Sequence, residues 1–129
     1  MNPDQQSQLE GTKLTGFEST TSVSELQIID TVEGTGDVVQ PGATITAHYT
    51  GALCADGTIF QSSHDMGRAI TFPLNGVIQG WQEGVPGMKV GGTRRLIIPA
   101  AQAYGAQSPS PNIPANSDLV FDIELAAIN

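Results

Sequence analysis

The chain has 129 residues, of which 39% are hydrophobic and only 14% are charged, a length and composition suited to one globular domain. Its 13 acidic residues against 5 basic ones give a net charge of −8, which excludes nucleic acid and anionic lipid surfaces as expected partners, because like charges repel. The single cysteine, Cys54, excludes an internal disulfide and a multi-cysteine zinc site.

Residues 1–24 are poor in apolar side chains and rich in Gln, Ser, Thr and Glu, which predicts a flexible polar tail before a domain over 25–129. The isolated Leu14 and Phe17 leave open a second possibility, that the tail lies in a groove on the domain. No apolar run is long enough to cross a membrane, so we expect no membrane contact by this domain. The N-terminus lacks the blocks of a signal peptide, which predicts a cytoplasmic protein if Met1 is native and an extracytoplasmic one if an export or anchor segment was removed.

Alternating and β-branched runs predict the strands of an antiparallel sheet. The Asp56-Gly57 dipeptide is a hairpin turn signal, and Gly91-Gly92 is a second one. Between the third and fourth runs, residues 63–68 are expected to form a bulge or loop. The five or six strands predicted in this way are 26–32, 44–50, 59–62, 69–72, 93–98 and 118–125.

The stretch from Val77 to Val85 has helical spacing and holds the only tryptophan, Trp81. On a helix its large apolar residues share one face: Val77, Ile78, Trp81 and Val85. Gly80 and Gly84 cost about 1 kcal/mol each relative to alanine, and so short a helix is marginal alone. Because glycines allow a neighbour to come close, we expect an α+β fold in which the sheet covers this helix and Trp81 forms the floor of a pocket.

The sequence offers few candidate residues for covalent catalysis or metal binding. Cys54 lies beside a hairpin turn with no helix N-terminus to favour its thiolate, and His48 is expected to make a structural hydrogen bond. No G-x-S-x-G motif is present. His64-Asp65 is the only His/Asp pairing, and the neighbouring Met66 is a soft ligand that suits hard oxygen donors poorly. We therefore expect neither a metal nor a cofactor.

Aromatic and aliphatic residues offer a different kind of site. A greasy cavity with a few hydroxyl donors is the usual form of a small-ligand site, and buried tyrosines need hydrogen-bond partners. An ordinary hydrophobic core built from the same side chains remains the alternative. The residues concerned are Tyr49, Phe60, Phe72, Val77, Ile78, Trp81, Tyr104 and Phe121.

Six ordered motifs over roughly residues 26–129 resemble the FKBP-type peptidyl-prolyl cis-trans isomerases, the family that binds the macrolides tacrolimus and rapamycin. The motifs are His48-Tyr49-Thr50-Gly51, Asp56-Gly57-Thr58-Ile59-Phe60, Val77-Ile78-Gln79-Gly80-Trp81, Gly87-Met88-Lys89-Val90-Gly91-Gly92, Ala103-Tyr104-Gly105 and Leu119-Val120-Phe121-Asp122-Ile123-Glu124-Leu125. The resemblance implies a half-open antiparallel sheet curled around one short helix. It also implies a monomeric, cofactor-free enzyme that accelerates X-Pro rotation in proline-containing polypeptides and so assists protein folding.

The resemblance further implies the site residues. Its catalytic pocket would be formed by Tyr49, Phe60, Phe121, the floor Trp81 and, at the mouth, Tyr104. Substrate contacts would come from Val77, Ile78, Gln61, Ile70 and, from a flap over 107–113, Ile113. Many family members have aspartate where Gln61 stands and an aromatic where Ile70 stands. The neutral Gln61 motivates an alternative, a low-activity proline-peptide binding module or chaperone of the same fold.

Overall fold

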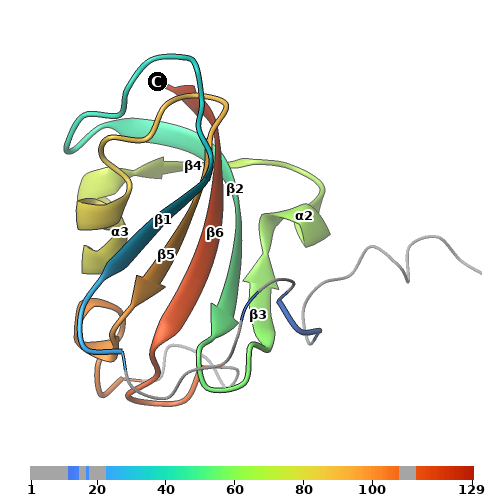
Figure 1. The fold of residues 1–129 in the computed structure, drawn as a ribbon, viewed down its shortest axis with the longest axis vertical. Coiled ribbons are helices and arrows are strands. Elements are labelled where there is room, and N and C mark those ends of the chain that lie inside the picture. Colours follow the sequence, from blue (N-terminus) through green and yellow to red (C-terminus); the bar gives the residue numbers. More distant parts are fainter. Residues whose placement is uncertain (1–11, 15–16, 18–22, 108–112) are drawn as a thin grey trace, which may run out of the picture.

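The computed structural model describes residues 12–14, 17, 23–107 and 113–129, and one antiparallel sheet dominates them (Figure 1). Its six strands are β1 (Gln27–Val32), β2 (Thr44–Leu53), β3 (Ile59–Ser62), β4 (Ile70–Pro73), β5 (Thr93–Ile98) and β6 (Leu119–Ile128). The helices are α2 (Ser63–Met66) and α3 (Gln79–Gly84), with 3-10 turns η1 (Leu74–Gly76) and η2 (Ala100–Gln102). Within these ranges, no helix has the length and apolar character to span a membrane.

The strands follow the order β1-β5-β6-β2-β3, and β4 also pairs with β2. Strands β3 and β4 share one edge of β2, where β3 pairs with residues 50–52 and β4 with residues 44–47. Helix α3 lies on one side of the curled sheet, beside β5 (Figure 1). The predicted fold class, an α+β arrangement of a half-open antiparallel sheet around a short helix, is confirmed.

The main core fills the space between the sheet and α3. Inward-facing positions of β6 are buried as their alternation predicts: Leu119, Phe121, Ile123 and Leu125. Val120, one step out of phase, is buried too, because a second apolar cluster covers the opposite face of the sheet. The sheet is therefore packed on both faces over part of its length.

This second cluster includes part of the predicted tail. The Leu14 amide donates to the Gly57 carbonyl at 2.8 Å, and the Ile59 amide donates to the Thr12 carbonyl at 2.8 Å. Phe17 packs against the cluster and lies 5.8 Å below the Arg95 guanidinium. The buried members are Leu14, Val23, Ala52, Cys54, Ile59, Ile97 and Val120. Residues 1–11, 15–16 and 18–22 lie outside the described residues, and the flexible tail over 1–24 stays a prediction.

The helices differ in two respects from the sequence prediction. Helix α3 begins only at Gln79, because Val77 (ψ 174°) and Ile78 (ψ 155°) are extended, so the expected helix of 77–85 was wrong at its first turn. The expected loop at 63–68 contains the short helix α2. Its capping groups explain why it forms: the Ser62 hydroxyl accepts from the His64 amide, and Gly67 ends the helix at φ 76°.

The two glycines of α3 bring the helix onto β5. A Cβ built on Gly80 would lie 2.6 Å from Cγ2 of Ile98, and one on Gly84 would lie 2.7 Å from Cδ2 of Leu96. The predicted close approach is confirmed. The end of α3 is also held by Arg94, whose Nη1 donates to the Gly84 carbonyl at 2.8 Å, a favourable place for a cation at a helix C-terminus.

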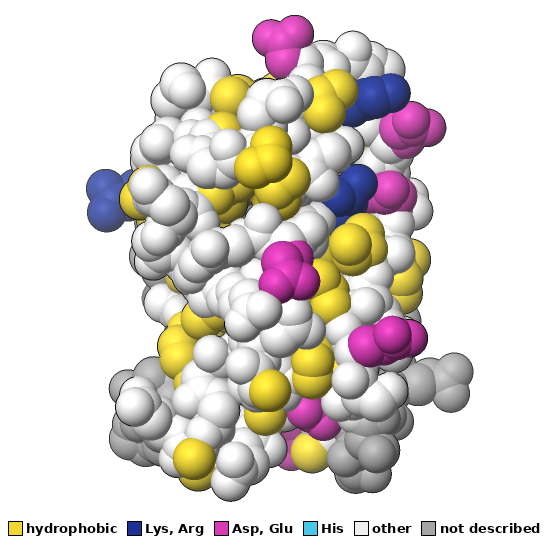
Figure 2. Space-filling model, turned by 90° about the vertical axis from the view of Figure 1, so that its left-hand side faces the viewer, with side chains coloured by type: hydrophobic (Ala, Val, Ile, Leu, Met, Phe, Trp, Pro, Cys, Tyr) yellow, Lys and Arg dark blue, Asp and Glu magenta, His cyan; other side chains and the backbone are white. Residues whose placement is uncertain are grey.

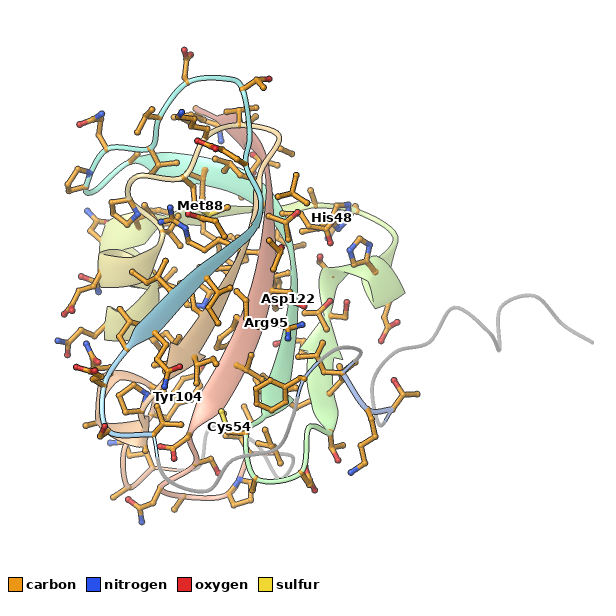
Figure 3. All side chains as sticks on the ribbon, in the orientation of Figure 1. His48, Cys54, Met88, Arg95, Tyr104 and Asp122 are labelled. Carbon is orange, nitrogen blue, oxygen red and sulfur yellow. The ribbon has the colours of Figure 1, made fainter. Side chains whose placement is uncertain are left out.

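An ion pair links β5 and β6 in the middle of the sheet. Arg95 on β5 donates from Nε and Nη2 to the Asp122 carboxylate on β6, at 2.7 and 2.8 Å, and Figure 3 shows the two side chains meeting across these strands.

Figure 2 shows the side that was on the left in Figure 1. There hydrophobic side chains reach the surface in separate groups among polar atoms, a distribution that is normal for a folded domain.

Candidate active site

A cavity of about 340 Å³ opens between the sheet and α3. Strands β2, β3, β4 and β6 supply its walls, the η1–α3 junction supplies one rim, and the loop after η2 supplies another. The described residues that line it are Tyr49, Phe60, Gln61, Phe72, Gly76, Val77, Ile78, Trp81, Tyr104 and Phe121. None of these side chains is an acid or a base of the carboxylate, histidine, lysine or arginine type.

Trp81 forms the centre of an aromatic cluster. Only 4% of its surface is exposed, and its ring centroid lies 5.0 Å from Phe72, 5.4 Å from Phe121 and 5.8 Å from Tyr49. The rings meet at steep angles, in the edge-to-face geometry that aromatic quadrupoles favour. The floor of the cavity is therefore held rigidly before any ligand arrives.

Gly51 makes room for two of the pocket rings. A Cβ at this position of β2 would lie 2.6 Å from Cζ of Phe60 and 2.7 Å from Cε1 of Phe121. Those rings pack edge to face at 5.7 Å. The glycine of the His48-Tyr49-Thr50-Gly51 motif thus has a packing reason, since any larger residue would push both rings into the cavity.

The two tyrosines differ in environment. Tyr104 is 38% exposed at the mouth, and its carbonyl accepts from the Gln107 amide at 3.1 Å, which folds this loop back on itself. Tyr49 is buried in the wall. Burial raises the pKa of its hydroxyl, and the neighbouring Tyr104 adds a smaller effect in the same direction. Tyr49 therefore remains a neutral phenol at physiological pH.

The structure brings together most of the site residues named from the sequence. Eight of the ten line the cavity: Tyr49, Phe60, Gln61, Val77, Ile78, Trp81, Tyr104 and Phe121. Ile70 instead pairs with Ala47 and packs against the main core, and Ile113 is a buried member of that core. Most of the expected flap, 108–112, lies outside the described residues. Sequence reasoning left Phe72 out of the site although it belongs to the aromatic set, and nothing in the sequence pointed to Gly76.

The reactive side chains lie away from this cavity. Cys54 is fully buried at the end of β2, in the second cluster, and burial followed by the nearby Asp118 raises the pKa of its thiol to about 12 (Figure 3). His48 makes the structural hydrogen bond expected of it, between its Nδ1 and the Ser63 hydroxyl, which lie 2.8 Å apart. Among the described residues, no three His, Cys, Asp or Glu side chains gather in a way that could hold a metal ion.

The buried Cys54 thiol predicts a loss of stability at alkaline pH. Its pKa is about 12 in the folded chain against an ordinary value of 9.0, so the unfolded chain releases this proton first as the pH rises. Above about pH 9 the free energy of unfolding should fall by up to about 1.4 kcal/mol per pH unit. Urea unfolding at several alkaline pH values measures this slope. Cys54→Ala should flatten it, and an unchanged slope in that variant would assign the effect to other groups.

Known proteins are similar to this chain over most of its length. Residues 36–126 match the family described as FKBP-type peptidyl-prolyl cis-trans isomerase. The chain is 46% identical to a probable FK506-binding protein of Corynebacterium glutamicum, over 78% of this chain and 85% of that protein. It is 48% identical to the isomerase FkpA of Aeromonas hydrophila over 90% of this chain, but spans only 42% of that longer relative.

A solved structure supports the same assignment. The isomerase of Pseudomonas syringae pv. tomato superposes with a TM-score of 0.73 at 35% identity, covering 81% of this chain and 75% of that one. The chain belongs to the family of FKBP-type peptidyl-prolyl cis-trans isomerases.

Proposed function

We propose that the Trp81 cavity is where this peptidyl-prolyl cis-trans isomerase turns X-Pro bonds between cis and trans. The observation that carries the proposal is the cavity itself: about 340 Å³ of space with an aromatic floor and walls, and with no formally charged side chain among the described residues that line it. That volume suits a proline ring with part of its neighbours. A second recess, between β1 and residues 87–94, holds only about 40 Å³ and is too small for one.

Such a cavity can lower the barrier without covalent chemistry. Rotation about the X-Pro bond costs about 18–20 kcal/mol, because amide resonance is lost in the twisted state. The planar amide is charge-separated, whereas the twisted amide is less polar at its carbonyl. An apolar, water-poor cavity therefore favours the twisted state relative to the planar one. Each 1.4 kcal/mol of this preference is worth about tenfold in rate.

The proposed roles follow from position. Trp81, Phe60 and Phe121 would hold the proline ring, and Tyr49 would close the wall beside it. Val77 and Ile78 form a rim with an extended backbone, and α3 begins only after them. The Val77 carbonyl accepts a hydrogen bond from the Gln82 side chain at 2.7 Å. The Ile78 amide and the Tyr104 hydroxyl would then bind the peptide on either side of the proline.

The proposed ligands are proline-containing polypeptides and macrolides such as tacrolimus and rapamycin. The named relatives support this, since one is called an FK506-binding protein and another an isomerase. Because Trp81 is the only tryptophan, its fluorescence reports directly on this cavity. A macrolide titration should change that fluorescence and inhibit isomerisation of a Leu-Pro peptide at matching concentrations. Binding without isomerase activity would instead favour a peptide-binding module. A monomeric state stays a prediction.

Tyr104→Phe tests the hydroxyl at the mouth. Loss of one hydrogen bond to the substrate, worth about 1 kcal/mol, should lower kcat/KM about three- to tenfold. The free energy of unfolding should barely change, because the side chain is partly exposed at the mouth and the substitution leaves its ring in place. A protease-coupled peptide assay measures the first quantity and urea unfolding the second. An unchanged kcat/KM would remove this hydroxyl from the mechanism.

A further inference from the structure

Strand β2 has a gap in its pairing at the pocket tyrosine. On one edge it pairs with β4 through residues 44–47 and with β3 through residues 50–52. His48 and Tyr49 fall between these two ladders, where α2 leads the chain away from the sheet (Figure 1). A buried backbone group without a partner is costly, so something must take the place of the missing strand here.

The Ser63 hydroxyl fills this gap. It accepts from the Tyr49 amide at 2.8 Å and lies 3.3 Å from the Tyr49 carbonyl, to which it can donate. Ser63 is fully buried at the first position of α2. One side-chain oxygen thus replaces both bonds that a neighbouring strand would make to this residue.

His48 directs the hydroxyl. Its Nδ1 lies 2.8 Å from the Ser63 oxygen, which makes a third contact. A hydroxyl has one hydrogen to give, so all three contacts are satisfied together only when His48 Nδ1 carries a hydrogen and Ser63 donates to the Tyr49 carbonyl. The His48 ring in turn stacks on His64 at 4.2 Å, and His64 Nε2 bonds Glu124 at 2.7 Å. The arrangement runs from the surface to the pocket wall.

We infer that Ser63 is a positioning residue for the isomerase pocket: it holds the Tyr49 backbone so that the phenol ring stays against Trp81. Ser63 does not line the cavity and would touch no substrate. The inference rests on the pocket proposed above, because it needs Tyr49 to be part of the working wall.

Ser62 provides a matched control. It is the adjacent residue, it is also buried, and its hydroxyl bonds Thr50 and the His64 amide, not Tyr49. We compare kcat/KM for a tetrapeptide with one Leu-Pro bond in Ser63→Ala, Ser62→Ala, Tyr49→Leu and the double variant Ser63→Ala/Tyr49→Leu. All variants are assayed under conditions in which circular dichroism shows that they are folded. If Ser63→Ala does not fold, Ser63→Cys replaces it, since a thiol fills the space but is a weak donor.

Ser63→Ala should lower kcat/KM about tenfold, Ser62→Ala less than about twofold, and Ser63→Ala should add less than about twofold once Tyr49 is leucine. If Ser63→Ala and Ser62→Ala lower kcat/KM equally, the cause is a general loss of packing around α2, and the inference is overturned. A full Ser63 effect in the Tyr49→Leu background, or no Ser63 effect at all, would overturn it too. If Tyr49→Leu alone leaves kcat/KM unchanged, the pocket assignment of Tyr49 fails first.

Discussion

Trp81→Ala is expected to lower kcat/KM at least about 100-fold and the free energy of unfolding by about 3–5 kcal/mol. The indole is almost fully buried and contacts the rings of Tyr49, Phe72 and Phe121. Its removal leaves a hole in the floor that water can enter, which raises the polarity around the amide. Since the free energy of unfolding of a domain is only about 5–15 kcal/mol, the variant will be only marginally stable.

Two further variants separate catalysis from stability. Trp81→Leu keeps an apolar floor of smaller volume and should fold, with kcat/KM still reduced about tenfold or more. Phe17→Ala removes an aromatic side chain that packs behind the sheet, so it should cost stability and leave kcat/KM unchanged. Folding must be followed by circular dichroism, because the Trp81 variants lack the fluorophore. If folded Trp81→Leu has the same kcat/KM as the parent chain, catalysis does not take place in this cavity.

The strands were predictable because their alternation has a simple physical cause. Strand β6 buries every second residue against one core, and β2 does the same over 44–49, so the period of two is visible in the sequence. The turn at Asp56-Gly57 was visible too, since Gly57 adopts φ 76°, a conformation that few other residues tolerate. These features depend on local sequence alone.

Other features depend on contacts that no local pattern reports. Val77 and Ile78 have helical spacing, yet they are extended, because η1 and the cavity rim occupy the place of a first helical turn. Ile70 and Ile113 pack into the core rather than line the cavity, a choice that tertiary packing makes. The role of Leu14 was equally hidden, since a single leucine in a polar stretch gives no period. Only the second cluster behind the sheet explains why it is buried.

The glycines of α3 provide the second large effect, because two physical arguments give opposite signs. Helix propensity alone predicts that Gly80→Ala/Gly84→Ala stabilises the chain by about 2 kcal/mol. Packing predicts the reverse, since the new methyl groups would lie 2.6 and 2.7 Å from Ile98 and Leu96. Both neighbours are fully buried in the core and have little room to move. We expect packing to prevail, with a net loss of at least about 3 kcal/mol in urea unfolding.

The same substitution should also affect catalysis, because α3 carries the floor of the cavity. Moving the helix away from β5 displaces Trp81 toward the opening, so kcat/KM should fall about tenfold in the protein that remains folded. Gly76→Ala is the matched control for stability, since a Cβ there meets only Pro73 at 3.5 Å, an ordinary contact. It should change the free energy of unfolding by less than about 1 kcal/mol. A double variant more stable than the parent would mean that the helix can shift freely on the sheet. The close approach of α3 to β5 would then not be what fixes Trp81 in place.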